Sequence, residues 1–101
     1  MVWDLRGALL KKEERESARL ADFEFRHRAR TFKLIAERLE TDPAPIVALT
    51  ARMDDETALR EVALRHPEAA DRTDALYQEC RAEARRQLIR ERGDPSPYRL
   101  L

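Results

Sequence analysis

Few side chains in this sequence are of the types that carry out catalysis or bind metals. The chain has two histidines, His27 and His66, and one cysteine, Cys80. No His-x3-His or Cys-x2-Cys spacing is present to place two metal ligands together on one helix. Nothing in the sequence indicates that Cys80 and a histidine form a nucleophilic pair. We therefore expect no catalytic residue, no metal site and no cofactor, and a protein that is not an enzyme.

Charged side chains offer two other kinds of site. The acidic run Asp54-Asp55-Glu56 lacks the alternating oxygens and the glycine turn of a calcium loop, so helix capping explains it better. Two arginine-rich clusters are compatible with phosphate binding, which makes a nucleic-acid-binding regulator the second interpretation. Its candidate contacts are Arg26, Arg28, Arg30, Arg81, Arg85, Arg86 and Arg90.

The composition predicts helices and argues against nucleic acid as a partner. Of the 101 residues, 60 are Ala, Glu, Lys, Leu or Arg, above the level typical of long helices or coiled coils. Twenty basic and twenty acidic residues cancel, so no net field attracts a polyanion or an anionic membrane. The single cysteine excludes an internal disulfide framework.

These side chains are expected on an all-α fold, a small bundle of two long helices with two short helices between them. The long helices are predicted over residues 8–40 and 68–92, because neither interval contains an internal proline or glycine. Pro43, Pro67 and Gly93 mark the helix boundaries. Residues 1–93 form a single domain, and residues 94–101 form a proline-containing extended tail. Tyr98, Leu100 and Leu101 of this tail are candidates for docking into a groove.

The first long helix has two apolar stripes, whereas a surface helix usually has one. The first stripe has a spine of residues at heptad spacing, and we assign it to the intramolecular core. This spine is Ala18, Phe25, Phe32 and Leu39. The opposite stripe is predicted to bind another chain, most simply in a two-fold homodimer. Its interface residues are Leu20, Phe23, His27 and Leu34. Alternatively, the middle helices fold back and cover it within a monomer.

No segment reaches the length of apolar chain that spans a membrane. The first residues include Asp4 and Arg6, where a signal peptide would have an apolar run. We therefore expect a cytoplasmic protein that does not associate with membranes.

The segment FRHRARTFKLI, residues 25–35, resembles a run in the first long helix of the zeta subunit of bacterial F-type ATP synthases. The matching residues are Phe25, Arg26, Ala29, Arg30, Lys33, Leu34 and Ile35. The resemblance implies a small four-helix fold and a regulatory subunit of this kind as a further alternative. Residues 1–12 do not resemble the family's inhibitory N-terminus, so no ATPase-inhibiting role is implied.

The function that these observations favour is that of a non-catalytic helical interaction or regulatory protein. Its working surface would be an apolar face of the first helix, and its partner a second copy or another protein.

Overall fold

The computed structural model describes residues 2–95, and the side chains from Glu14 to Pro95. It contains four α-helices, α1 (Val2–Arg38), α2 (Pro43–Leu49), α3 (Asp55–Arg65) and α4 (Thr73–Arg92), and the short 3-10 helix η1 (Pro67–Arg72). Residues 2–95 include no strand, so the all-α prediction is confirmed. The first helix begins six residues earlier than predicted, because its backbone continues through Gly7. The last α-helix begins later, because Pro67 starts the separate helix η1.

Local chemistry explains where α1 ends and α2 begins. Glu40 adopts a left-handed conformation with φ 56°, and the Thr41 amide bonds the Ala36 carbonyl at 3.0 Å, as in a Schellman motif. The Asp42 side chain then accepts a hydrogen bond from the amide of Ala44. Pro43 occupies the first turn of α2, where its missing amide costs nothing.

The remaining boundaries follow the predicted signals. The Asp54 carboxylate caps α3 by accepting the Thr57 amide at 2.8 Å. Hydrogen bonds from Thr57 lower the pKa of Asp54. His66 ends α3 before Pro67, and Gly93, with φ 85°, ends α4.

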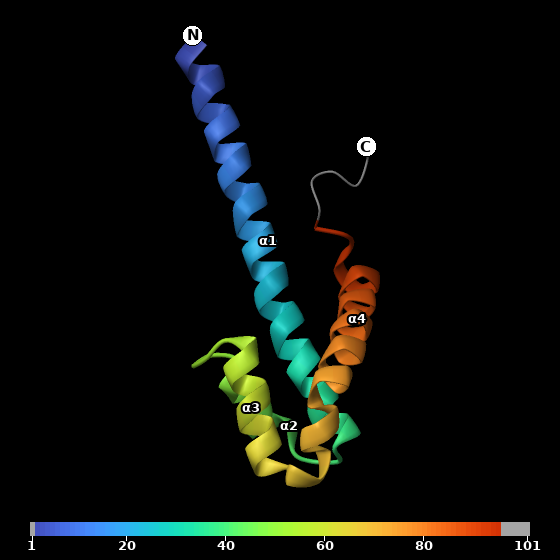
Figure 1. The fold of residues 1–101 in the computed structure, drawn as a ribbon. Coiled ribbons are helices and arrows are strands. Elements are labelled where there is room, and N and C mark those ends of the chain that lie inside the picture. The colour runs from blue at the N-terminus through green and yellow to red at the C-terminus, as the bar shows by residue number, and fades with distance from the viewer. Residues whose placement is uncertain (1, 96–101) are drawn as a thin grey trace.

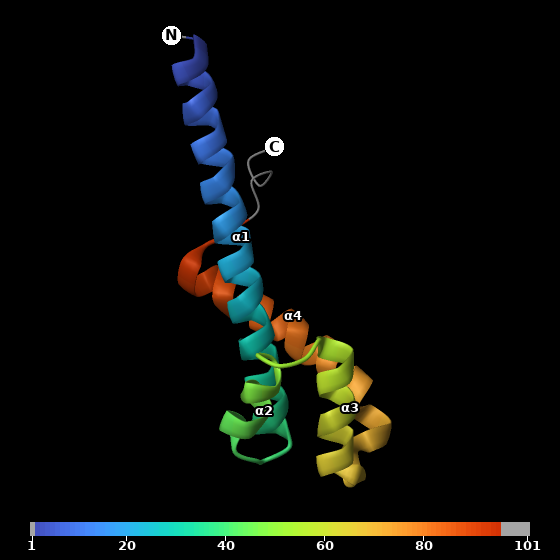
Figure 2. The ribbon, with the colours of Figure 1, turned by 90° about the vertical axis from the view of Figure 1, so that its left-hand side faces the viewer.

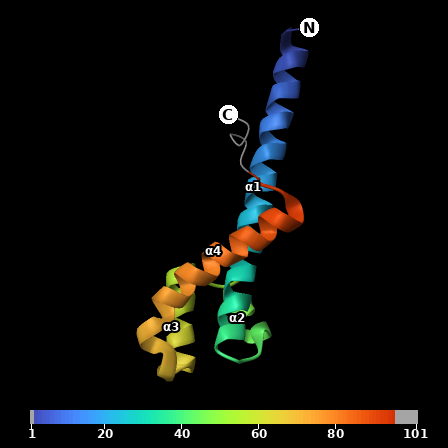
Figure 3. The same ribbon diagram turned by 90° about the vertical axis from the view of Figure 1, so that its right-hand side faces the viewer.

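The molecule is a long rod with its other helices gathered at one end. Figure 1 shows α1 running the length of the molecule, with α4 returning antiparallel to it. Figure 2 shows α2 beside the C-terminal end of α1 and α3 beside the start of α4. In Figure 3, α4 crosses α1 obliquely. The N-terminal half of α1 therefore extends past the end of α4, and the molecule measures 63 × 26 × 20 Å. No helix among the described residues is long and apolar enough to cross a membrane.

The core lies where α1, α2, α3 and α4 meet. Its members are largely aliphatic, with one ring and one thiol: Phe32, Ile35, Ala36, Ile46, Leu49, Ala58, Leu59, Val62 and Cys80. The core position expected for Phe32 is confirmed. Leu34 and Leu39 are partly buried against this cluster.

The assignment of the two α1 stripes needs correction. Phe25, expected in the core, is 64% exposed. Phe23 and His27, expected at an interface with another chain, are 4% and 2% exposed and pack against this chain's own α4. Leu20, at 37% exposed, remains near the surface. Because α4 crosses α1 obliquely, it covers one stripe near Phe23, while the core forms on the other stripe around Phe32.

Candidate interaction groove beside Phe25

A groove of about 400 Å³ lies between α1, α2 and α4. Its apolar lining is Phe25, Ala29, Val47 and Leu88, and its charged lining is Arg26, Arg30, Lys33, Glu91 and Arg92. An exposed aromatic ring beside small apolar side chains, bordered by charges, is the usual anatomy of a protein-binding patch.

Arg30 links α1 to α4 beside the groove. Its guanidinium donates to the Gln87 side-chain oxygen at 2.9 Å and to both carboxylate oxygens of Glu91 at 3.0 Å. The hydrogen bond from Arg30 lowers the pKa of Glu91. This bidentate contact holds α4 against α1, so that Leu88 of α4 and Ala29 of α1 line the same groove.

The charge around the groove is positive. Asp22 pairs with Arg26 at 3.0 Å and with Arg92 at 3.3 Å. Lys33 is exposed. Four basic side chains thus border the groove against Glu91 and Asp22. A ligand with apolar and acidic groups complements this lining.

Most arginines predicted to contact nucleic acid are engaged with acids of this chain. The pairs are Arg26–Asp22, Arg28–Asp55, Arg30–Glu91, Arg81–Asp55, Arg86–Glu83 and Arg90–Glu83. The exception is Arg85, whose guanidinium lies 5.7 Å from the centre of the Phe23 ring. Phosphates would have to compete with these acids, which weakens the case for a nucleic-acid surface.

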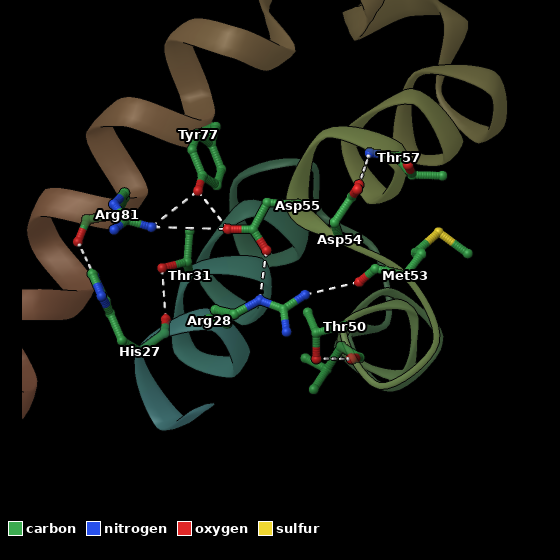
Figure 4. Close-up of polar contacts among 11 residues, drawn as sticks. His27, Arg28, Thr31, Thr50, Met53, Asp54, Asp55, Thr57, Tyr77 and Arg81 are labelled. Atoms are coloured by element: carbon green, nitrogen blue, oxygen red, sulfur yellow. Dashed lines mark hydrogen bonds and ion pairs between the residues drawn. The ribbon is translucent and has the colours of Figure 1, made fainter. Parts of the chain in front are cut away.

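A polar cluster joins three helices next to the core (Figure 4). The Asp55 carboxylate of α3 accepts hydrogen bonds from Arg28 of α1 at 2.6 Å and from the Tyr77 hydroxyl of α4 at 2.5 Å. Burial acts to raise the pKa of Asp55, but the hydrogen bonds from Tyr77 and Arg28 outweigh it, so the pKa is lowered. Burial and the bond to Asp55 raise the pKa of Tyr77. Arg28 also donates to the Met53 carbonyl, so this cluster fixes the position of α3.

Cys80 and the two histidines are the side chains whose types allow nucleophilic catalysis or metal binding. Cys80 is fully buried, and burial raises the pKa of its thiol, which disfavours the reactive thiolate. His66 lies 3.4 Å from Glu68 at the end of α3. Glu24 and His27 are three residues apart, a spacing at which both side chains could bind one metal ion. Glu24 is exposed, however, whereas His27 is buried. From residue 14 to residue 95, no group of three His, Cys, Asp or Glu side chains is placed to hold a metal ion.

Sequence reasoning missed the exposure of Phe25 and the cluster around Asp55. Rings of both stripes contact α4, Phe32 through Tyr77 and Phe23 through Arg85, so the pattern does not show which stripe α4 covers near Phe25. The short acidic run predicted the helix cap that Asp54 provides, but it gave no sign that Asp55 contacts Arg28 and Tyr77. Tyr98, Leu100 and Leu101 of the predicted tail lie outside the described residues.

Comparisons with protein-family models, curated proteins and solved structures returned no match. They do not bear on the resemblance of residues 25–35 to the zeta subunit, which therefore contributes no site residue.

Proposed function

We propose that this chain is a non-catalytic interaction protein that uses the exposed face of α1 around Phe25, with a second copy of the chain as its partner. The observation that carries this proposal is the large exposed fraction of the Phe25 ring beside an apolar groove with a basic border. Burying a phenylalanine side chain contributes about 1.5–3 kcal/mol, so this face favours association.

We propose a second copy as the partner because the N-terminal half of its α1 can occupy the groove. This part of α1 lies beside no other helix in the described fold (Figure 1). Most of the stability of a helix in a protein comes from the packing of one of its faces, so this part of α1 favours a partner. Its acids Glu13, Glu14 and Glu16 alternate with bases, so charge complementarity requires a register that brings one of these acids to the basic border of the groove.

In an antiparallel, two-fold dimer, the Phe25 ring of each copy is covered and the N-terminal half of each α1 gains a packed face. Glu14, Ala18, Ala21, Phe25 and Ala29 follow one another at spacings of three or four residues, so they share one face of α1. We place the Phe25 ring of one copy against Ala18 of the other, where the small side chain allows close approach. In this register Glu14 faces Ala29, one helical turn from both Arg26 and Lys33. Each copy then supplies one groove and one N-terminal segment of α1 that carries Glu14.

The first test is the measurement of molar mass against concentration, by light scattering coupled to size exclusion. Phe25→Ser should weaken dimerisation about 100-fold, because two rings per dimer each lose about 1.5 kcal/mol of burial. Leu64→Ser is the matched control, since Leu64 is 76% exposed on α3 and outside the groove. A wild-type protein that stays monomeric at millimolar concentration would refute self-association, as would equal effects of the two substitutions.

A charge exchange tests the register. Lys33→Glu and Glu14→Lys should each weaken the dimer, and the double variant should recover because opposite charges face each other again. Failure of the double variant to recover would overturn the antiparallel register. Raising the salt concentration separates the interpretations, because an apolar interface persists while phosphate binding weakens steeply.

A further inference from the structure

A second cleft, of about 260 Å³, lies along the contact between α1 and α4. It is lined by His27, Gln78, Arg81, Ala82 and Arg85. We propose that this cleft binds a small oxyanion that retains an O–H group, with inorganic hydrogen phosphate as its ligand. The proposal is independent of the dimer, because the cleft and the Phe25 groove share no lining residue.

The first observation is an unsatisfied atom of His27. The ring is 2% exposed, and its Nε2 lies 2.8 Å from the Arg81 carbonyl oxygen. A carbonyl only accepts, so Nε2 carries the hydrogen and donates it. The Nδ1 of the neutral ring then presents a lone pair, and this buried atom has no hydrogen-bond partner among the described residues. Buried polar atoms are rarely left unpaired, so Nδ1 calls for a donor.

The second observation is a pair of arginines that line the same cleft. Arg81 and Arg85 are separated by one turn of α4 and therefore lie on the same side of it. Arg85 makes no ion pair with any side chain described from residue 14 onward. Arg81 directs one nitrogen to the Tyr77 hydroxyl at 3.0 Å and to the Asp55 carboxylate at 3.8 Å, which leaves its other nitrogens for a ligand. Like charges one turn apart disfavour each other, and an anion between them reverses that effect.

These two observations together define the ligand. The arginines require anionic oxygens, and Nδ1 requires an O–H. Inorganic phosphate meets both requirements throughout the neutral range, whereas sulfate has no proton to donate. The cleft is smaller than the 300–1,000 Å³ typical of sites for drug-sized molecules, which suits a small ion.

The exposed side chain of Arg85 provides the means of entry. Its guanidinium lies over the Phe23 ring, and that ring is 5.9 Å from the His27 ring. Because Nδ1 is buried, the ion reaches it when Arg85 swings from Phe23 toward the cleft. Binding should therefore perturb the resonances of both rings.

The test is an NMR titration of the full chain slightly above neutral pH with phosphate, sulfate or methyl phosphate. The readouts are the His27 Nδ1 resonance and the Phe23 ring protons. Phosphate should bind at least fivefold more tightly than sulfate, because sulfate leaves Nδ1 unpaired. Methyl phosphate, whose second pKa is about 6, is largely without an O–H under these conditions and should bind like sulfate. Equal affinity for all three ions would refute the role of Nδ1.

Variants separate this site from general attraction to positive charge. Arg85→Gln should weaken phosphate binding about tenfold, because it removes one charged donor. Arg72→Gln is the control, since Arg72 is exposed on η1 and outside the cleft. Gln78→Ala should also weaken binding while leaving the Arg85–Phe23 contact intact. Equal losses in Arg72→Gln and Arg85→Gln, or the absence of any phosphate-dependent shift at His27, would overturn the proposal.

Discussion

Asp55 offers the most direct test of how the helices are held together. Its carboxylate receives hydrogen bonds from Arg28 and Tyr77, and Arg81 lies 3.8 Å away. Asp55→Asn removes the charge but keeps the size of the side chain. Hydrogen bonds to charged groups contribute about 1.5–3 kcal/mol each, and solvent reaches part of this cluster, with Asp55 22% and Arg28 30% exposed. We therefore expect the free energy of unfolding to fall by about 2 kcal/mol.

The neighbouring aspartate is the matched control. Asp54 caps α3 through one hydrogen bond to the Thr57 amide, and asparagine caps helices equally well. Asp54→Asn should therefore change the free energy of unfolding by less than about 0.5 kcal/mol. Urea denaturation followed by circular dichroism measures both variants, with an unchanged m-value as the sign that the two-state transition is preserved. Equal losses in the two variants would refute the role assigned to Asp55.

Asp55→Asn also tests how the free energy of unfolding depends on pH. The folded-state pKa of Asp55 lies below the ordinary aspartate value of about 3.9. Its stabilising contribution is therefore complete above that value and is lost as the pH falls through the folded-state pKa. The difference between wild type and Asp55→Asn should be constant from neutral pH to about pH 5 and disappear in stronger acid. A difference that persists when the carboxylate is protonated would contradict this account.

Three further predictions concern the core and its edge. Phe32→Ala should lower the free energy of unfolding by about 3–5 kcal/mol, because the ring is fully buried, and a loss below about 1 kcal/mol in urea denaturation would contradict its core position. Phe23→Ala should cost about 3 kcal/mol in the same assay while Phe25→Ala costs less than about 0.5 kcal/mol, since only the first ring packs against α4; comparable losses would refute the revised stripes. The Cys80 thiol should react with a disulfide reagent far more slowly in the folded chain than in urea, because it is buried and its pKa is raised, and similar rates would show that the site opens readily.

The helices and their ends could be predicted because they depend on neighbouring residues. Pro43 and Pro67 restrict the backbone wherever they occur, and Gly93 readily adopts the positive φ that ends a helix. The side chains of Asp42 and Asp54 reach only two or three residues ahead. Such effects can be recognised in the sequence without knowledge of the tertiary fold.

The packing of α1 could not be predicted because it depends on contacts between distant residues. Which stripe faces α4 is set by the oblique crossing and by contacts such as His27–Arg81, between residues 54 positions apart. Asp55 and Tyr77 are 22 positions apart, and neither has a neighbour that predicts their hydrogen bond. The groove beside Phe25 arises from the same crossing. The sequence therefore showed that Phe25 belongs to an apolar stripe of α1, but not that this part of the stripe is exposed.

The length of α1 also governs how the molecule moves in solution. The radius of gyration is 17.4 Å, whereas a compact chain of this many residues has about 13 Å. A single copy should therefore tumble anisotropically and leave a gel-filtration column ahead of a spherical standard of equal mass. Elution volume alone would make one copy resemble two, and relaxation anisotropy of the backbone amides would reveal the rod directly.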